Sequence, residues 1–278
     1  MDPSLLEQLF LTGAIEFAPA DRPFWYTSGM LGPFYINTQY LFGGRLKAEE
    51  FLLQIEQASR TPERLVEHLM PRIIEELDTN PSFSSLIDRA AEAIEPLDFD
   101  IISGGERRDF FFSLPLAHRL QKNHLSIMKD GSSYLSSPDA TLAEPDLAGR
   151  TVLHVADIVT RASSFTRQWI PSIRRLGATI RHAFAMLDRC QGGAEVLQAE
   201  GVELFTLGRI DRSFLDQAIQ SGRLSESECQ TIETFLEDPM RYMQDFLLQH
   251  PSFIDQAIEQ GGKSQDRAEL AIRSGFVR

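Results

Sequence analysis

The sequence contains few cysteines and no long hydrophobic run, and each shortage excludes a class of protein. Cys190 and Cys229 are too few for a disulfide framework and lack the spacing of a metal site. No apolar segment approaches the roughly 18 residues that a membrane helix needs. The N-terminal segment MDPSLLEQLF carries acids rather than the basic start of a signal sequence. We therefore expect a cytoplasmic protein that does not bind a membrane.

Positive charge is also scarce, since 27 Lys and Arg face 40 Asp and Glu, for a net charge of −13. This balance argues against a nucleic-acid-binding surface. Residues 48–100 hold 13 acids and 4 bases, and residues 216–278 hold 11 acids and 6 bases. Acids grouped in this way are typical of solvated helix faces. The remainder, with 16 acids and 17 bases, can bind an anionic ligand without opposition from a strong negative field.

Short apolar runs alternate with helical patterns between residues 99 and 207. Near-continuous apolar strands between helices indicate a parallel sheet covered on both faces, with ligands at the carboxyl ends of its strands. The sequence thus predicts an α/β fold with an open, mostly parallel sheet. The expected strands are 99–103, 124–128, 151–156, 179–188 and 202–207; the expected helices are 111–122, 164–177 and 192–201; and a polar loop is expected from 128 to 149.

Two further segments have a helical pattern and high acid content. In residues 48–97 we expect Pro71 to kink or split a helix, and in residues 225–260 we expect two or three short helices separated by prolines. Both segments are either appendages on one core or part of a dimer face. We expect a domain over residues 1–215, with an N-terminal hood (1–47) and a helical insertion (48–97), followed by a helical C-terminal extension (216–278).

The aromatic segment 24–44 has two interpretations. It reads FWYTSGMLGPFYINTQYLFGG and is consistent with a strand and hairpin. Such a hood can offer aromatic surface and backbone groups to a flat ligand. The same residues can equally form only the aromatic core of the hairpin.

The stretch TVLHVADIVTRASSF, residues 151–165, carries the clearest chemical signal. A buried strand delivers Asp157 to its end, and a turn rich in hydroxyl groups then opens a helix. Backbone N–H groups at a helix start favour an anion, and hydroxyl and guanidinium groups add donors. The turn is also compatible with an ordinary N-cap of the Ser/Thr type. The candidate anion-binding residues are Thr160, Arg161, Ser163 and Ser164.

The order of four motifs resembles the type I phosphoribosyltransferases, and the orotate phosphoribosyltransferases in particular. The resemblance covers residues 9–47 and 98–215. It implies the fold of that family and the transfer of ribose 5-phosphate from phosphoribosyl pyrophosphate (PRPP) to orotate or a related base. It also implies a homodimer, and a Mg²⁺ ion that is carried by the donor rather than held directly by the protein. The motifs are YTSGMLGPFYIN (26–37), FDIISGG (99–105), ADIVTRAS (156–163) and MLDRCQGG (186–193).

The resemblance also implies roles for individual residues. By resemblance, Lys129, Asp157 and Arg107 are catalytic, and Asp157 holds the ribose. The 5′-phosphate lies on Thr160, Arg161, Ala162, Ser163 and Ser164. The pyrophosphate lies on Arg107, Arg108 and Lys129. The base contacts Thr27, Phe34 and Arg189.

Several positions depart from the family pattern and favour an alternative. Ala156 stands where the family has the first of two acids, and Ala162 replaces a turn glycine. Residues 128–149 retain one cation, Lys129, where the family has a mobile loop rich in Lys, Arg and His. Thr27 stands in place of a hood lysine. The alternative is a catalytically impaired relative that binds nucleotide-like ligands or regulates another protein.

The cationic residues and His154 also have structural interpretations. Arg107 and Arg108 can pair with the adjacent Glu106 and Asp109 instead of a pyrophosphate. Arg189 can form a structural pair with Asp188. His154 lies inside the strand over 151–156, and we expect it to be a core histidine with satisfied hydrogen bonds.

Overall fold

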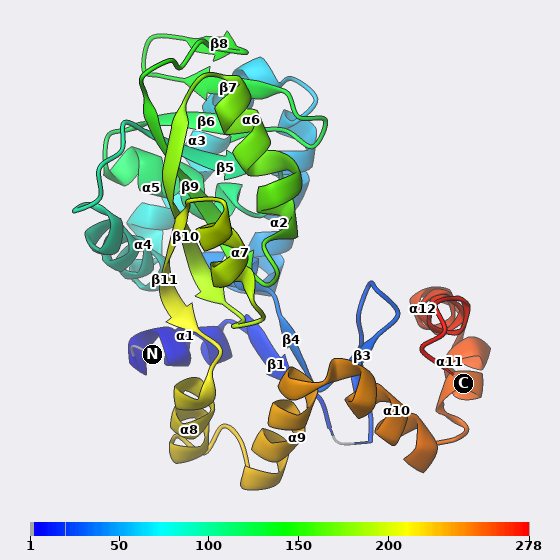
Figure 1. The fold of residues 1–278 in the computed structure, drawn as a ribbon. Helices are drawn as coiled ribbons and strands as arrows, with labels where there is room; N and C mark the ends of the chain where they lie inside the picture. The colour runs from blue at the N-terminus through cyan, green and yellow to red at the C-terminus, as the bar shows by residue number, and fades with distance from the viewer. Residues whose placement is uncertain (1–2, 20, 278) are drawn as a thin grey trace. The chain divides into compact units, whose positions relative to one another are not determined.

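A computed structural model describes residues 3–19 and 21–277 of the chain (Figure 1). The chain divides into two compact units. The first contains the residues up to Ala14 together with Thr38–Phe214, and the second contains Ile15–Asn37 together with the residues from Leu215 on. We grouped residues 15–37 with the sheet from sequence, whereas their packing groups them with the C-terminal segment. Among the described residues, no helix is both long enough and apolar enough to cross a membrane.

The first unit is built on a seven-stranded sheet, which confirms the predicted open α/β fold. Five neighbouring strands are parallel, and the two at one edge are antiparallel. All of the strands predicted from apolar runs are present. In spatial order the strands are β11 (Glu203–Arg209), β10 (Thr179–Asp188), β9 (Thr151–Val159), β5 (Ile101–Gly105), β6 (Asn123–Ile127), β7 (Ser133–Ser136) and β8 (Thr141–Ala143).

The prediction of a polar loop over 128–149 was wrong, because this segment forms the two antiparallel strands β7 and β8. A tight turn joins them, in which the Ser137 amide donates to the Ala140 carbonyl at 2.9 Å. Both strands lie at the edge of the sheet, are three or four residues long and are rich in serine and threonine. Strands of this kind lack the apolar run on which the sequence argument depended.

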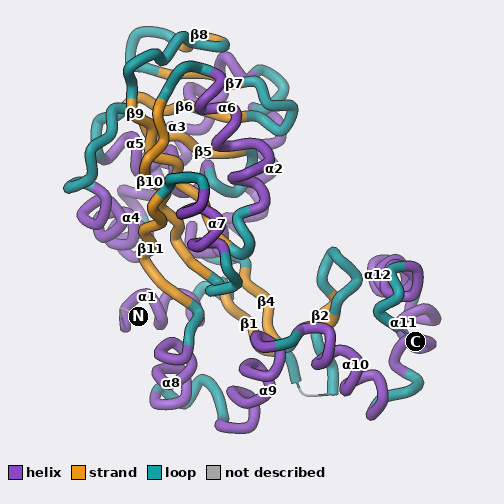
Figure 2. Tube along the Cα trace, in the orientation of Figure 1, coloured by secondary structure: helices purple, strands orange, loops and turns teal. Residues whose placement is uncertain are grey.

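Helices cover both faces of the sheet, as crossover geometry requires. The step from β5 to β6 runs opposite to the step from β9 to β10, so right-handed crossovers place their helices on opposite faces. Figure 2 shows helices on both sides of the strands. These helices are α5 (Phe110–Arg119) between β5 and β6, α6 (Ile170–Arg175) between β9 and β10, and α7 (Gly193–Ala199) between β10 and β11.

Residues 48–97 are helical as predicted. Pro71 does not split α3; its ring lies on the exposed side of the helix, where water can reach the Glu67 carbonyl that proline leaves unpaired. Two short helices precede and follow the hairpin segment of the second unit, α1 (Pro3–Leu11) and η1 (Thr38–Phe42). The insertion comprises α2 (Arg45–Ala58), η2 (Pro62–Arg64), α3 (Leu65–Thr79) and α4 (Pro81–Ile94).

The second unit packs two short hairpins against C-terminal helices through aromatic side chains. Phe34 lies edge-on to Phe235 with ring centroids 5.7 Å apart, and Trp25 stacks on Phe253 at 5.8 Å. The prediction of two or three helices over 225–260 is confirmed. The paired strands are β1 (Ile15–Phe17) with β4 (Phe34–Ile36) and β2 (Phe24–Trp25) with β3 (Leu31–Gly32). The helices are α9 (Glu226–Glu237), α10 (Pro239–Gln249), α11 (Phe253–Gln260) and α12 (Gly262–Arg273). The boundary with the first unit falls within α8 (Arg212–Gln220).

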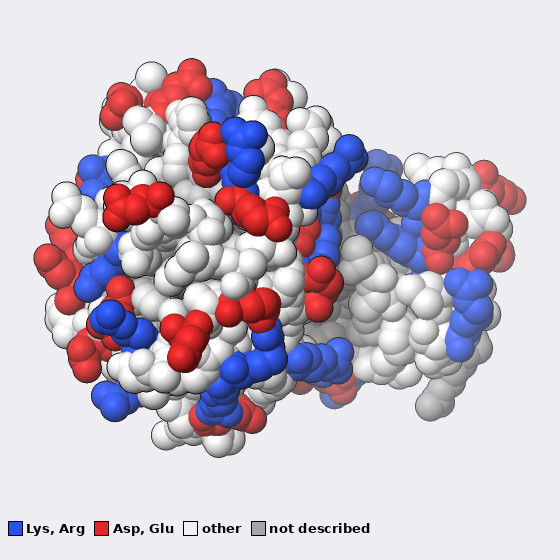
Figure 3. Space-filling view, turned by 90° about the horizontal axis from the view of Figure 1, so that it is seen from above, with Lys and Arg blue, Asp and Glu red and all other residues white. Residues whose placement is uncertain are grey.

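Acidic side chains are scattered over the surface in Figure 3. On the face seen there, Asp and Glu alternate with Lys and Arg instead of forming one continuous patch. Arg45 and Glu49 of α2, for example, form an exposed ion pair. Exposed acids of the helical insertion such as Glu49 are therefore solvated, locally paired charges.

Candidate active site

A cavity of about 360 Å³ lies where the carboxyl ends of β5 and β9 meet. The turn after β5, the turn after β9 and the first residue after Met128 line it, so three separate segments contribute. This is the edge at which ligands bind in open α/β sheets. Eight of the predicted site residues line this one cavity: Arg107, Arg108, Lys129, Asp157, Thr160, Ala162, Ser163 and Ser164.

The other predicted site residues lie elsewhere. Arg161 is exposed and Arg189 is half-buried; neither is among the described residues that line the cavity. The Arg189 amide donates to the Val159 carbonyl at 2.9 Å, so it lies at the same edge of the sheet, one strand away. Thr27 and Phe34 belong to the second unit, where Thr27 is exposed and Phe34 is buried. Their contact with a base stays a prediction.

Asp157 is held rigidly inside β9, which extends two residues beyond the acid instead of ending before it. Its side chain is buried. Oδ2 accepts a hydrogen bond from Thr38 Oγ1 at 2.7 Å, and Oδ1 accepts one from the Ile158 amide at 2.8 Å. Sequence reasoning missed Thr38, which lies far from Asp157 along the chain.

Asp109 is a second buried carboxylate beside Asp157, and sequence reasoning considered it only as a surface partner for arginine. It precedes the first residue of α5. Oδ1 accepts a hydrogen bond from the Asp157 amide at 3.0 Å, and Oδ2 accepts one from the Gly105 amide at 3.0 Å. Asp109 therefore ties the end of β5 to β9 at the cavity. An acid at the start of a helix that follows a buried strand was the available sequence signal.

Burial and a neighbouring carboxylate change the protonation of Asp157. Burial raises the pKa of Asp157 to about 7, and the nearby Asp109 acts in the same direction. The hydrogen bond from Thr38 and the charge of Arg108 oppose the rise in this pKa but do not cancel it. Near neutral pH the carboxyl is thus poised between its two forms, as is common at functional sites.

This raised pKa predicts a pH dependence of folding stability. Between the ordinary carboxyl pKa near 4 and about pH 7, the native protein retains a proton that the unfolded chain has released. Asp157 therefore stabilises the fold at low pH, and this contribution is lost as the pH rises through about 7. We expect the free energy of unfolding in urea to fall between about pH 4 and pH 8 relative to that of Asp157→Asn. Parallel pH profiles of the two proteins would contradict the raised pKa.

The cations at the cavity are partly engaged by acids. The Arg107 guanidinium forms an ion pair with Glu56 of α2, so it pairs with neither Glu106 nor Asp109. The Lys129 amide donates to Glu106 Oε2 at 3.1 Å, and its ammonium lies 3.9 Å from Glu106 Oε1. Arg108 is exposed and makes no ion pair within the described part of the chain. It is the cation most available to an anion in the cavity.

The hydroxyl-rich turn after β9 adopts the backbone conformation of a glycine turn although it contains alanine. Ala162 is buried with φ at 51°, in the left-handed region that favours glycine. The helix that follows begins with a π-helical turn, Phe165–Trp169, in which the Ile170 amide donates to the Phe165 carbonyl. Pro171 has no amide hydrogen for the Arg167 carbonyl, which explains the irregular start of the predicted helix 164–177.

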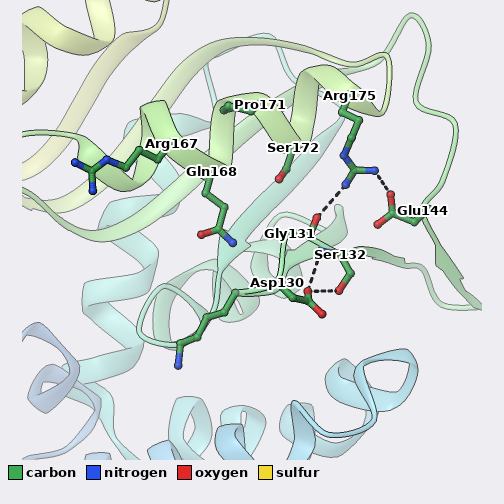
Figure 4. A pocket seen from close by; sticks show the side chains of 10 residues that line it. Asp130, Gly131, Ser132, Glu144, Arg167, Gln168, Pro171, Ser172 and Arg175 are labelled. Atoms are coloured by element: carbon green, nitrogen blue, oxygen red, sulfur yellow. Dashed lines mark hydrogen bonds and ion pairs between the residues drawn. The ribbon is translucent and has the colours of Figure 1, made fainter.

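A second cavity, of about 630 Å³, adjoins the segment that carries Lys129 (Figure 4). Arg175 of α6 donates to the Gly131 carbonyl at 2.9 Å and forms an ion pair with Glu144, so it joins both ends of the β7–β8 segment to the helix. Gln168 donates to the Met128 carbonyl at 2.6 Å. These contacts hold the backbone on either side of Lys129 in place.

The cavity at the carboxyl ends of β5 and β9 contains two buried carboxylates, Asp109 and Asp157, that could contribute ligands to a magnesium ion. Among residues 3–19 and 21–277, no group of three His, Cys, Asp or Glu side chains can hold a metal ion. Mg²⁺ keeps several waters and binds through one or two carboxylates plus phosphate oxygens. Asp157, which lines this cavity together with Arg107, Arg108 and Lys129, could supply the protein's share of such a shell.

Comparison with known proteins finds curated relatives of low identity. The sequence matches no profile of a known protein family. An orotate phosphoribosyltransferase from Sulfolobus acidocaldarius is 25% identical over 156 residues, which cover 55% of this chain and 76% of the relative. The chain is related to the type I phosphoribosyltransferases. This relationship confirms the resemblance drawn from the four motifs.

Solved structures agree with the phosphoribosyltransferase fold. The orotate phosphoribosyltransferase of Aeropyrum pernix aligns with a TM-score of 0.51 at 20% identity and covers 77% of this chain and 98% of that chain. The UMP synthase of Leishmania donovani aligns with a TM-score of 0.59 at 15% identity over 84% of this chain. This phosphoribosyltransferase-like chain spans 42% of the length of that UMP synthase. At these identities the likeness concerns the fold alone.

Proposed function

We propose that this chain is a phosphoribosyltransferase of the orotate type, which transfers ribose 5-phosphate from PRPP to orotate or a related base in pyrimidine nucleotide synthesis. One observation carries the proposal. A single cavity at the carboxyl ends of β5 and β9 brings together a buried carboxylate, a turn of hydroxyl groups and three cations. The names of the sequence relatives support the same reaction.

The residues of the cavity have distinct tasks in this reaction. The bond between C1 of the ribose and the pyrophosphate oxygen breaks, and its electron pair leaves with the pyrophosphate. A nitrogen lone pair of the base forms the new bond to C1, and the proton on that nitrogen is released. Arg108, Lys129 and Arg107 stabilise the negative charge that develops on the leaving group. Asp157 accepts hydrogen bonds from the ribose hydroxyls, and Thr160 to Ser164 bind the 5′-phosphate.

The remaining parts of the proposal concern the metal, the base and the assembly. Mg²⁺ carried by PRPP supplies further charge neutralisation on the pyrophosphate. Arg189, Thr27 and Phe34 are the proposed contacts of the base. The proposal also expects a homodimer in the cytoplasm, and light scattering coupled to size-exclusion chromatography tests the oligomeric state.

A transferase assay tests the proposed function directly. The purified chain is incubated with PRPP and Mg²⁺ together with orotate, or with other pyrimidine or purine bases one at a time, and released pyrophosphate is measured. Turnover with orotate, or with one related base, supports the proposal. No turnover with any base, together with no binding of PRPP by calorimetry, would contradict it.

Two features favour a second candidate, a ligand-binding or regulatory relative with impaired catalysis. Position 156 carries an apolar alanine in place of an acid, and two of the cavity cations are already paired with acids of the chain. The first removes a hydrogen-bond acceptor for the ribose, and the second reduces the stabilisation available to a departing pyrophosphate. Tight binding of PRPP without turnover on any base would favour this second candidate.

The pairing of Arg107 predicts a gain of affinity when its acid partner is removed. We expect Glu56→Gln to strengthen the binding of pyrophosphate severalfold, because Arg107 then meets the ligand without first leaving Glu56. The half-exposed position of this pair keeps the effect on folding stability below about 1 kcal/mol. Calorimetric titration with Mg²⁺-pyrophosphate measures the affinity. Glu49→Gln, which removes an acid from the same helix, is the matched control and should leave it unchanged.

Ala162, in the hydroxyl-rich turn after β9, predicts a second gain of affinity. Glycine at position 162 relieves the left-handed backbone and removes the methyl group of a residue that lines the cavity, so the backbone can approach a phosphate more closely. We expect Ala162→Gly to bind ribose 5-phosphate severalfold more tightly. Its free energy of unfolding should change by less than about 1 kcal/mol, since relief of strain and greater freedom of the unfolded chain oppose each other. Weaker binding of ribose 5-phosphate by Ala162→Gly than by the wild type would contradict this interpretation of the turn.

A further inference from the structure

Position 156 cannot supply the second carboxylate that a ribose site of this family uses, but another residue lies on the same face. Ala156 is buried in the apolar core that also contains Trp169. Side chains alternate along a strand, so residues 154 and 156 point to one face of β9 and residue 157 points to the other. The Asp109 carboxylate lies against His154, with Oδ2 3.5 Å from His154 Nε2. The Asp109 carboxylate therefore lies on the side of β9 to which residue 156 points.

We propose that Asp109 supplies the second carboxylate of the ribose site, in place of the acid that position 156 lacks. The inference rests on the proposed function and deepens it by naming a further substrate-binding residue. Asp109 lines the same cavity as Asp157, and its Oδ1 accepts the Asp157 amide at 3.0 Å. Two neighbouring carboxylates can each accept one hydroxyl of a ribose diol. Together they also stabilise the positive charge that develops on the ribose as pyrophosphate leaves.

The Asp109 side chain is held in place before any ligand binds. Its Oδ2 accepts the Gly105 amide at 3.0 Å, and it follows directly the turn that carries Arg107 and Arg108. A fixed carboxylate loses little freedom when it accepts a further hydrogen bond. Asp109 thereby joins the pyrophosphate side of the cavity to the ribose side.

His154 is a positioning residue for Asp109. The imidazole is fully buried; its Nδ1 lies 2.9 Å from Ser103 Oγ, and its ring stacks on Trp169 with centroids 5.6 Å apart. Within the described part of the chain, Nε2 makes no hydrogen bond and faces the Asp109 carboxylate. His154 thus acts beyond the expected role of a core histidine, because it directs its second nitrogen at the carboxylate on its own face of β9.

The test separates the ribose from the pyrophosphate part of the donor. Wild type, Asp109→Asn and the double variant Asp109→Asn with Ala156→Asp are titrated with PRPP and, separately, with pyrophosphate, both with Mg²⁺. We expect Asp109→Asn to weaken PRPP binding at least about tenfold while pyrophosphate binding stays within about twofold of wild type. Ala156→Asp should restore PRPP binding to within about threefold, since it returns a carboxylate to that face. Asp100→Asn, at the opposite end of β5, is the control with the same change of charge.

Three outcomes would overturn the role of Asp109: unchanged PRPP binding in Asp109→Asn, equal loss for both ligands, or no recovery in the double variant. Wild-type protein that binds neither ligand contradicts the proposed function instead, so the two failures are distinguishable. If Asp109→Asn does not fold, His154→Gln retains both carboxylates and replaces the test. It should weaken PRPP binding severalfold and leave pyrophosphate binding unchanged, and unchanged PRPP binding would overturn the proposal.

Discussion

Asparagine in place of Asp157 should lower the turnover of ribose 5-phosphate transfer about a hundredfold, equivalent to roughly 3 kcal/mol of transition-state stabilisation. The carboxylate is buried and aligned by Thr38. In the proposed reaction it would therefore act on the ribose without reorganisation or screening by water. Asparagine has the same shape and can keep the bond from Thr38 but carries no charge. The effect should therefore fall on turnover, with PRPP binding weakened less.

The fold and a matched charge change provide the controls for this prediction. Asp157→Asn should retain the circular dichroism spectrum and the cooperative unfolding transition of the wild type. Asp139→Asn alters the net charge equally but lies exposed in the β7–β8 turn, and its turnover should equal that of wild type. Wild-type turnover in Asp157→Asn would remove this residue from the mechanism.

The parts of the fold that the sequence predicts are those in which a single segment carries its own signal. β9 and β10 are long apolar runs, and the helix after β9 buries Phe165, Trp169 and Ile173, as their spacing indicated. β7 and β8 were not predicted, because a short strand at the edge of a sheet has few buried residues and no apolar run. The hydroxyl-rich turn after β9 was visible for the same reason as β9: its hydroxyl groups are adjacent in the sequence.

The parts of the site that escaped prediction depend on residues distant in the chain. Thr38 and Asp157 are 119 residues apart, and Asp109 and Asp157 are 48 apart, yet each pair is joined by a hydrogen bond. Single-sequence patterns report local periodicity and carry no record of such pairs. Asp109 was visible only as an acid next to two arginines, so surface pairing was the simplest interpretation. The pKa of Asp157 is raised mainly by burial and in part by the nearby Asp109, and this second contribution was equally inaccessible.

The helical insertion contains a buried acid that the periodicity of α3 could have revealed. Glu76 falls on the apolar face between Ile73 and Leu77 and is fully buried. Lys47 of α2 lies 2.9 Å from both of its carboxylate oxygens, and Asn80 Nδ2, at the start of α4, donates to Oε1 at 2.7 Å. One side chain thus joins three helices. An acid on the apolar stripe of an amphipathic helix signals such a partnered, buried charge.

We expect Glu76→Ala to lower the free energy of unfolding by about 3 kcal/mol. The substitution leaves the Lys47 ammonium and the Asn80 amide at a cavity without an acceptor. Lys47 is 42% exposed, which allows it to turn to water and places the loss at the lower end of the range for broken buried pairs. Urea unfolding measures the free energy of Glu76→Ala and of a control, Glu49→Ala, which removes one acid of an exposed ion pair on α2. Equal losses of less than about 0.5 kcal/mol in both variants would mean that Glu76 contributes no more than a surface charge.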